Sequence, residues 1–434
     1  MPGATSERRF FDVAIAGGGF AGQTLALVLA KQAPRGFRIA LVDAEAPAAQ
    51  SGRAQDARGL ALSSATRSLL AVLGLWDALA PAAQPISSIE ITDSPLEADL
   101  RSHFLGFDDE LNGGEATAYI VEAGPLNRVL SAAVAEEKAI DVIAPDLVSD
   151  FTAGPFTVTA KLMQGGEIEA RLLVAADGKR SKTRERAGIK CVGWSYPQIG
   201  IVTTVAHERP HRGRAVQHFL PAGPFAILPL TGNRSSIVWT EEKTRGDVIV
   251  AASEAEFVAE LTKRFGPRLG EISLAGSRQS FPLDLQIARN FVADRLALIG
   301  DAAHVVHPLA GQGLNIGMRD MAALAEIIVE SARLGLDFGD APQLERYERW
   351  RRFDSAFSAT VMDGLNRLFS NDSAPLRVLR DFGLGLVDRA PAVKRFLVRE
   401  AADIVAPVGI ARHGEVDAGG DLVVQRLPAG GRVS

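Results

Sequence analysis

Residues 295–320 read RLALIGDAAHVVHPLAGQGLNIGMRD and predict a strand, a glycine-rich turn and a helix in succession. The apolar run 296–299 predicts a buried strand that stops at Gly300 and Asp301, and the pattern over 314–334 predicts a helix. This order places a carboxylate at a strand end beside a helix N-terminus. Free N–H groups and the helix dipole at such a place suit an anion or an electron-rich carbonyl. The stretch therefore indicates a cofactor site without identifying the cofactor.

The N-terminal segment carries a dinucleotide-binding pattern. A predicted apolar strand over 11–16 runs into Gly17, Gly19 and Gly22, which match G-x-G-x-x-G, and a helix is predicted over 23–33. The first glycine makes the tight turn, the second lets the backbone approach a pyrophosphate, and the third lets helix and strand pack closely. The pattern therefore favours a bound dinucleotide.

A carboxylate stands at the distance that this pattern requires. The second predicted strand, 37–42, ends at Asp43, which lies 21 positions after Gly22. An acidic side chain at that place can take the ribose hydroxyls of the dinucleotide. A secretory signal peptide is the alternative, and the glycines inside the apolar run together with Asp43 argue against it.

A third segment, 171–184, reads RLLVAADGKRSKTR. A predicted strand over 172–176 ends at Asp177 and Gly178, and Arg184 falls in the first turn of a predicted helix. Taken alone, the segment is equally well described as a strand, a turn and the solvated start of a basic helix.

Together the three segments resemble the fingerprints of the flavin-dependent aromatic hydroxylases, the single-component monooxygenases of the para-hydroxybenzoate hydroxylase fold. Further stretches are similar to the ubiquinone-biosynthesis branch of that family: DARGLALS (56–63), FLPAGPFAILPL (219–230), HPLAGQGLNIGMRD (307–320) and DGLNRLFSND (363–372). The resemblance runs from about residue 11 to about residue 402. It implies an α/β fold in which a Rossmann-like FAD-binding domain is interrupted by a β-sheet substrate domain and followed by a helical C-terminal region.

The predicted elements divide the chain accordingly. We expect the FAD-binding domain and C-terminal helices in residues 1–88, 115–190 and 284–403, and the substrate-binding sheet domain in 89–114 and 191–283. Strands of that sheet are predicted over 199–205, 215–220, 225–229 and 235–240, interrupted by one helix over 253–265. Residues 404–434 show no clear periodicity, and we expect a poorly ordered tail.

The resemblance implies an enzyme that uses FAD, NAD(P)H and O2. In this family NAD(P)H reduces the flavin, oxygen adds to it as a hydroperoxide, and the distal oxygen is transferred to an electron-rich ring carbon. We therefore expect an FAD-dependent monooxygenase that hydroxylates the ring of a polyprenylated phenol or benzoquinol in ubiquinone biosynthesis. The residues leave open which ring carbon is hydroxylated and whether the donor is NADH or NADPH.

The resemblance also assigns roles around the flavin. The segment with Gly311, Gly313, Leu314 and Asn315 is expected at the pyrimidine edge, where backbone donors at a helix start favour the anionic reduced flavin. The ribityl or pyrophosphate side is expected to contact Gly300 and Asp301.

Two other residues are expected nearer the phosphates and the donor. Arg58 resembles the arginine that the family brings to the FAD phosphates. Asp177 is expected to serve both FAD and the passing nicotinamide cofactor, with help from Arg184. No second G-x-G-x-x-G is present, which is typical of a family that docks NAD(P)H transiently.

Two histidines are the candidate acid–base residues. His304 and His307 lie beside the glycine-rich cofactor segment, where either could deprotonate a phenol. A histidine in such a place is more often a hydrogen-bonded part of the scaffold, so the catalytic residue stays open.

Composition limits the remaining function classes. A chain of 434 residues suits two domains, and a net charge of -5 argues against a nucleic-acid partner. The single cysteine, Cys191, excludes an intramolecular disulfide and a multi-cysteine metal site, so we expect no metal. No apolar run is long enough to span a bilayer. We expect a cytoplasmic protein with peripheral contact at the inner face of the membrane, near a prenylated quinone precursor and other members of a ubiquinone-biosynthesis complex.

Three alternatives to this function remain at the level of sequence. The first alternative is a hydroxylase of soluble aromatics, and the second is a prenyl-lipid reductase of the same fold. The third is a non-catalytic flavin-binding subunit of a biosynthetic complex. A flavin halogenase is disfavoured because the four tryptophans form no W-x-W-x-x-P motif.

Overall fold

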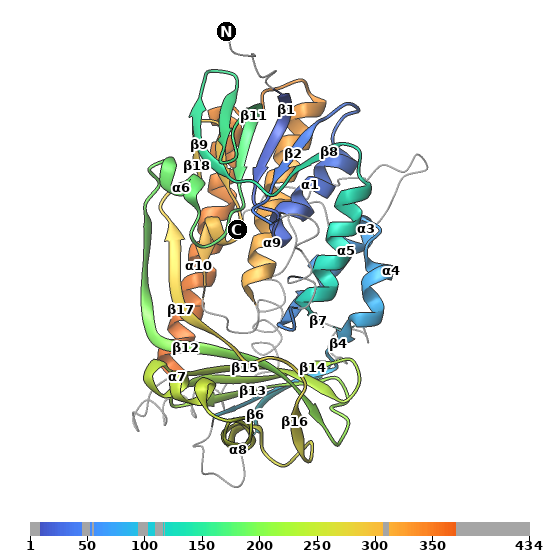
Figure 1. The fold of residues 1–434 in the computed structure, drawn as a ribbon, viewed down its shortest axis with the longest axis vertical. Helices are drawn as coiled ribbons and strands as arrows, with labels where there is room; N and C mark the ends of the chain where they lie inside the picture. The colour runs from blue at the N-terminus through green and yellow to red at the C-terminus, as the bar shows by residue number, and fades with distance from the viewer. Residues whose placement is uncertain are drawn as a thin grey trace, which may run out of the picture.

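The computed structural model describes residues 9–45, 53, 56–93, 103–108, 116, 118–306 and 312–369. Within them the chain forms two large sheets at opposite ends of the molecule, with helices beside and between them (Figure 1). This arrangement confirms the predicted α/β architecture with a second sheet and C-terminal helices. No helix in this described part of the chain is both long enough and apolar enough to cross a bilayer.

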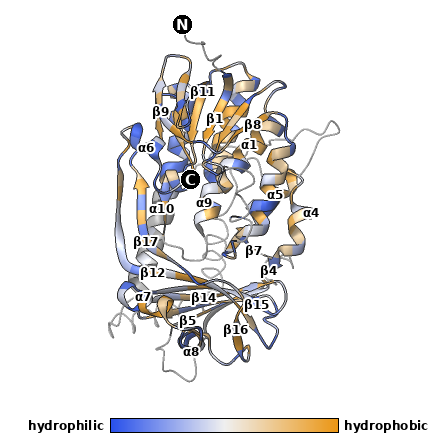
Figure 2. Cartoon of the chain, in the orientation of Figure 1, coloured by the Kyte–Doolittle hydropathy of each residue, from blue (hydrophilic) through white to orange (hydrophobic). Residues whose placement is uncertain are grey.

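The first sheet is built around parallel strands. Its main path is β18 (Val292–Ala293), β19 (Leu296–Leu298), β11 (Glu167–Ala175), β1 (Arg9–Ala16), β2 (Ile39–Val42) and β8 (Ile140–Ile143), and the antiparallel strands β10 (Val158–Leu162) and β9 (Val148–Ala153) continue from β11. From β19 to β8 all neighbours are parallel. Parallel strands are covered on both faces, which is why the C-terminal halves of β1 (13–16) and β11 (172–175) are continuously hydrophobic and buried (Figure 2).

Helices cover this sheet and extend toward the second one. The longer ones are α1 (Phe20–Gln32), α5 (Ala123–Glu136), α9 (Gln312–Arg333) and α10 (Ala341–Phe369), and shorter ones are α3 (Ser64–Val72), α4 (Trp76–Leu79), α6 (Lys182–Arg186) and the 3-10 turns η2 (Ala80–Ala82) and η4 (Gly300–Ala302). Helix α1 packs between α5 and α9, and α10 contacts β18 in the first sheet and two strands of the second. Helix α9 already includes Gly313, so the predicted turn at this residue is wrong.

The second sheet is mainly antiparallel. Its path is β20 (His304–Val305), β17 (Gln279–Ala288), β12 (Cys191–His207), β15 (Arg234–Glu242), β14 (Gly223–Leu230), β13 (Arg214–Leu220), β5 (Ser88–Asp93) and β6 (His103–Asp108), and β16 (Ile272–Leu274) pairs with β12. A small third sheet lies between the two large ones and contains β3 (Gly59–Ser63), β7 (Ala118–Glu122) and β4 (Gln84–Pro85).

Two helices, rather than the single predicted one, interrupt the second sheet. Helix α7 (Lys243–Ala251) precedes α8 (Glu254–Phe265), which begins where the sequence predicts, at a capping box formed by Ser253 and Glu256. The prediction missed α7 because Gly246 and several β-branched residues give its sequence a weak helix propensity.

The two faces of the second sheet have different surroundings. Ile201, Trp239 and Phe225 form one cross-strand row, and these side chains pack into a core with α8. The next row, Val202, Val238 and Ala226, points the opposite way because successive side chains alternate across a strand. This second face is turned toward the first sheet and borders the site described below.

Candidate functional site

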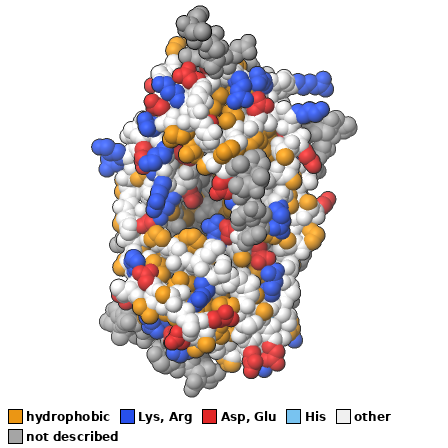
Figure 3. All heavy atoms as spheres, viewed as in Figure 1, with side chains coloured by type: hydrophobic (Ala, Val, Ile, Leu, Met, Phe, Trp, Pro, Cys, Tyr) orange, Lys and Arg blue, Asp and Glu red, His pale blue; other side chains and the backbone are white. Residues whose placement is uncertain are grey.

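A cavity of about 690 Å³ lies between the first and second sheets. This size is typical of ligand pockets, and the face of the molecule shown in Figure 3 is hollowed between the two ends. Most of the predicted cofactor-binding residues line it: Gly17, Gly19, Asp43, Arg58, Asp177, Gly300, Asp301, Gly313 and Leu314. The fold therefore brings segments from across the chain to one place.

The glycines of the first fingerprint have different reasons to be glycine. Gly17 has φ +112°, and a Cβ there would collide with the carbonyl oxygen of Ala176. A Cβ at Gly22 would collide with the carbonyl oxygen of Gly17, so Gly22 allows α1 to pack on the turn. Gly19 has ordinary backbone angles, and no atom of the described residues lies within 4 Å of a Cβ built there. The fold requires Gly17 and Gly22, whereas at Gly19 the open space on the cavity side favours a ligand as the reason for glycine.

The N-terminus of α1 suits an anion. Its N-cap is Gly19, which supplies no side-chain hydrogen bond, and the first turn contains no acidic residue. The unpaired N–H groups and the positive end of the helix dipole are thus available at the cavity wall. A pyrophosphate fits this cradle.

Asp43 follows β2 and is 4% exposed. Its carboxylate accepts two hydrogen bonds from Arg53, at 2.8 and 3.0 Å, and Arg53 also donates to the carbonyl oxygen of Gly18 at 3.1 Å. Arg53 therefore joins the acidic residue to the glycine loop. The sequence reasoning missed Arg53, because it lies outside every recognised motif.

Asp177 presents an unused acceptor. Its Oδ2 accepts hydrogen bonds from the backbone N and the Oγ1 of Thr183, at 3.1 and 3.0 Å. Its Oδ1 is buried and has no hydrogen-bond partner among the residues that the structure describes. A buried carboxylate oxygen in this state favours a ligand that supplies a donor, such as a hydroxyl group.

Asp301 lies on η4, directly after the left-handed Gly300, whose φ is +58°. The residue is exposed, and its side chain lines the cavity. Desolvation by the neighbouring protein raises the pKa of its carboxyl above the ordinary 3.8, although His304, Arg58 and Lys179 lower this pKa in part. Asp301 thus presents its carboxyl group to the cavity.

The start of α9 completes the cofactor side of the cavity. Gly313 and Leu314 line it, and within the described part of the chain a Cβ at Gly313 would meet no atom within 4 Å. The Asn315 side chain faces β3 instead, where it accepts from the N–H of Ser63 at 3.2 Å and donates to the carbonyl oxygen of Ala61 at 2.8 Å. Any cofactor contact of Asn315 is therefore expected from its backbone. Gly311 lies outside the described residues.

His304, the candidate histidine that the structure describes, is not among the residues that line the cavity. His304 is 2% exposed, and its Nε2 lies 2.6 Å from Oδ2 of Asp320. This contact favours the scaffold interpretation over acid–base catalysis. His307 lies outside the described residues.

The opposite wall is apolar. It is formed by one face of the second sheet, with Gly200, Val202, Ala226, Leu228, Val238, Phe281 and Leu283. Arg58 stands where the two walls meet, paired with Asp56 and with its guanidinium 5.6 Å from the centre of the Phe281 ring. A phosphate-binding cradle thus faces a surface suited to a hydrophobic ring.

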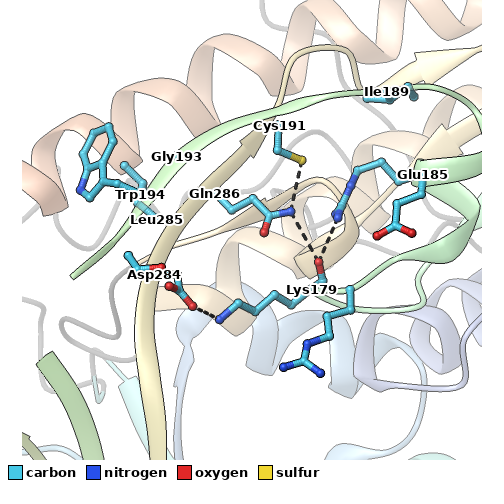
Figure 4. Close-up of a pocket in the computed structure, with 12 residues that line it drawn as sticks. Lys179, Glu185, Ile189, Cys191, Gly193, Trp194, Asp284, Leu285 and Gln286 are labelled. Atoms are coloured by element: carbon cyan, nitrogen blue, oxygen red, sulfur yellow. Dashed lines mark hydrogen bonds and ion pairs between the residues drawn. The ribbon is translucent and has the colours of Figure 1, made fainter. Parts of the chain in front are cut away.

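A second, more open groove of about 540 Å³ begins beside the D-G segment. Figure 4 shows Lys179 paired with Asp284 at its edge and Gln286 beside Cys191. Arg184 donates to the carbonyl oxygens of Ala302 at 2.8 Å and Lys179 at 3.0 Å. Arg184 therefore connects the D-G segment to the G-D segment, a structural role that the sequence did not indicate.

Comparisons with known proteins agree with this site. A family model described as an FAD binding domain matches residues 11–353. The chain is 43% identical to the ubiquinone hydroxylase UbiL of Rhodospirillum rubrum, over 92% of this chain and 91% of the relative. It is 33% identical to the 3-demethoxyubiquinol 3-hydroxylase of Escherichia coli, over 90% of this chain and 98% of the relative.

Among solved structures, the p-nitrophenol 4-monooxygenase PnpA of Pseudomonas putida superposes with a TM-score of 0.75. The match covers 92% of this chain and 99% of that chain, at 18% identity. At this identity the likeness concerns the fold alone. It places the two-sheet architecture among FAD-dependent monooxygenases of the para-hydroxybenzoate hydroxylase fold.

Proposed function

Because this chain belongs to the FAD-dependent hydroxylases of ubiquinone biosynthesis, we propose that it hydroxylates the aromatic ring of a polyprenylated phenol or benzoquinol, with NAD(P)H as electron donor and O2 as oxygen source. The observation that carries the proposal is the cavity with two unlike walls. One wall has the glycine loop and carboxylates of a dinucleotide site, and the other is an apolar sheet face.

The residues present fit FAD. The N-terminus of α1 with Gly19 would hold the pyrophosphate, Asp43 held by Arg53 would take the ribose hydroxyls, and Asp177 would offer its free Oδ1 to a hydroxyl donor. Asp301 would accept from the chain that joins flavin to phosphate. Bound FAD, once reduced, supplies the electrons that activate O2 for transfer of one oxygen atom to the ring.

The apolar wall would hold the substrate ring and exclude water. Valine, alanine, leucine and phenylalanine side chains make no hydrogen bond to water and so favour an aromatic ring over solvent. An isoprenoid tail adds to this preference, since each buried CH2 contributes about 0.8 kcal/mol. Withdrawing the whole tail from lipid into water would be prohibitive, so we propose peripheral contact with the membrane or presentation by partner proteins.

The groove beside the D-G segment is the proposed approach of the nicotinamide cofactor. It adjoins Asp177 and carries the basic side chains of Lys179 and Arg180. Arg184 would contribute by holding the backbone of Lys179 and Ala302 in place, because its guanidinium already donates to their carbonyl oxygens.

The experiment compares a polyprenylated phenol with the same phenol lacking its tail. We expect NAD(P)H oxidation and O2 uptake to rise on addition of the prenylated phenol, with formation of a hydroxylated product. Equal turnover of the tail-free phenol would instead indicate a hydroxylase of soluble aromatics. FAD binding without turnover of either phenol would indicate a non-catalytic subunit, and NAD(P)H oxidation with saturation of the tail would indicate a prenyl-lipid reductase.

A further inference from the structure

Asp320 lies where four elements meet behind the cavity. Its Oδ2 accepts hydrogen bonds from the N–H of Gly300 on η4, at 3.0 Å, and from Nε2 of His304 on β20, at 2.6 Å. Its Oδ1 accepts from Nε of Arg351 on α10, at 2.8 Å. The side chains of Asp320, His304 and Arg351 are 0%, 1% and 3% exposed. One buried carboxylate on α9 thus connects η4, β20 and α10.

The bond to Gly300 holds a turn that borders the cavity. Gly300 lies beyond the end of β19 and has φ +58°, a left-handed conformation that favours glycine. Asp301 follows it at the cavity wall. Helix α9 approaches closely at Gly317, where a Cβ would lie 3.2 Å from the Cα of Gly300. The turn is therefore supported by α9 and lines the cavity.

Asp320 is charged in this position. Burial alone would raise the pKa of its carboxyl, but His304 and Arg351 more than offset this effect and keep the pKa below its ordinary value. An ionised carboxylate accepts hydrogen bonds on both oxygens, which is what its three donors require. An amide cannot do so, because its nitrogen would meet at least one donor.

We propose that Asp320 is a positioning residue of the cofactor site: held by His304 and Arg351, it fixes Gly300 and Asp301 in the geometry that binds FAD, without touching the cofactor itself. His304 acts in the same way, as the donor that orients Asp320. This inference rests on FAD occupying the cavity and is independent of which substrate is hydroxylated.

The competing explanation is that the cluster only stabilises the fold. Asp354 distinguishes the two, because it belongs to the same cluster without reaching the turn. It pairs with Arg351 at 2.7 Å and with Arg319 at 3.0 Å, and no bond joins it to η4 among the described residues. Asp354→Asn is therefore the matched control for Asp320→Asn.

The experiment measures FAD affinity by flavin fluorescence, on the full-length chain stripped of FAD and titrated with it. Thermal unfolding of the FAD-free protein is recorded in parallel. We expect Asp320→Asn to weaken FAD binding about tenfold or more. Asp354→Asn should lower the melting temperature while leaving the dissociation constant within about twofold of wild type. Equal affinity of Asp320→Asn and wild type, or an equal loss in both variants, would overturn the proposal.

His304 supplies a second test, needed if Asp320→Asn does not fold. His304→Gln retains a side-chain N–H that can donate to Asp320, whereas His304→Leu does not. We expect His304→Gln to keep near-wild-type FAD affinity and flavin absorption, and His304→Leu to lose affinity and alter the flavin spectrum. If both variants bind FAD as wild type does, His304 does not position the turn.

Discussion

Arg184 donates a hydrogen bond of 2.8 Å to the carbonyl oxygen of Ala302, across 118 positions of sequence. The bond ties the D-G segment, where Arg184 lies on α6, to the G-D segment on η4. The same guanidinium reaches the carbonyl oxygen of Lys179 at 3.0 Å. Two fingerprints of the cofactor site are thus held in place by one buried arginine.

Replacing this arginine should loosen both segments. A lysine in Arg184→Lys cannot reach two carbonyl oxygens with a planar fork, so at least one buried acceptor is left unpaired. We expect the free energy of unfolding of the FAD-free protein to fall by about 1–3 kcal/mol, measured by urea denaturation. Arg186→Lys, on the same helix but in an exposed pair with Asp150, should change it by less than about 0.5 kcal/mol. Similar losses in the two variants would contradict this role for Arg184.

Two substitutions in the glycine loop should separate an effect on folding from an effect on FAD binding. Gly17→Ala places a methyl group against the carbonyl oxygen of Ala176 at a strained backbone angle, so we expect a poorly folded protein. Gly19→Val adds its side chain to the open cavity, so we expect a folded protein, judged by circular dichroism, with FAD affinity reduced more than about a hundredfold. Normal FAD affinity in Gly19→Val would refute the phosphate-loop interpretation.

The raised pKa of Asp301 predicts a trade-off between stability and binding. As pH rises above 3.8, the Asp301 carboxyl loses its proton in the unfolded chain before it does so in the folded chain. The free energy of unfolding therefore falls between pH 3.8 and the raised pKa of the folded state. Asp301→Asn removes this loss of stability, because an amide does not ionise. We expect the FAD-free variant to melt at a higher temperature than wild type at neutral pH, with the difference shrinking toward pH about 4.

The same variant should bind FAD about tenfold more weakly, because an amide is a poorer acceptor than a carboxylate. Wild-type affinity together with an unchanged melting temperature would show that Asp301 neither causes this loss of stability nor contacts FAD. Both quantities are obtained from one preparation, by thermal unfolding and by flavin fluorescence.

The apolar wall should control the substrate and not the cofactor. Val202→Asp places a carboxylate on the sheet face that lines the cavity, so we expect kcat/KM for the prenylated phenol to fall about tenfold to a hundredfold with FAD affinity unchanged. Val192→Asp is the matched control, since Val192 is 51% exposed on the same strand and does not line the cavity. An unaffected kcat/KM in Val202→Asp would remove this wall from the substrate site.

The sequence predicted the parts of the site that depend on local geometry. Glycine spacing, strand ends and the acid at Asp43 are local features, and the structure brings them to one cavity. The contact of each of these residues with FAD stays a prediction. The partners of Asp320 lie 16, 20 and 31 positions away, and periodicity does not indicate such tertiary contacts.

The predicted length of one strand was wrong for a related reason. The strand predicted over 199–205 extends over Cys191–His207, because β17 pairs along much of its length and β15 and β16 add to it. Its exposed first half, with Gly193 and Trp194, shows no alternation that would predict a strand. Backbone pairing with a distant partner, rather than the strand's own residues, sets its beginning.

The source of the inserted oxygen tests the central claim most directly. The full-length, FAD-loaded protein is supplied with NAD(P)H, a polyprenylated phenol and isotopically labelled O2, and the product is examined by mass spectrometry. Our account predicts a hydroxylated ring that carries one labelled oxygen atom, formed only when NAD(P)H is present. A hydroxyl oxygen derived from water, or consumption of NAD(P)H and O2 with no hydroxylated ring from the prenylated phenol, would contradict it.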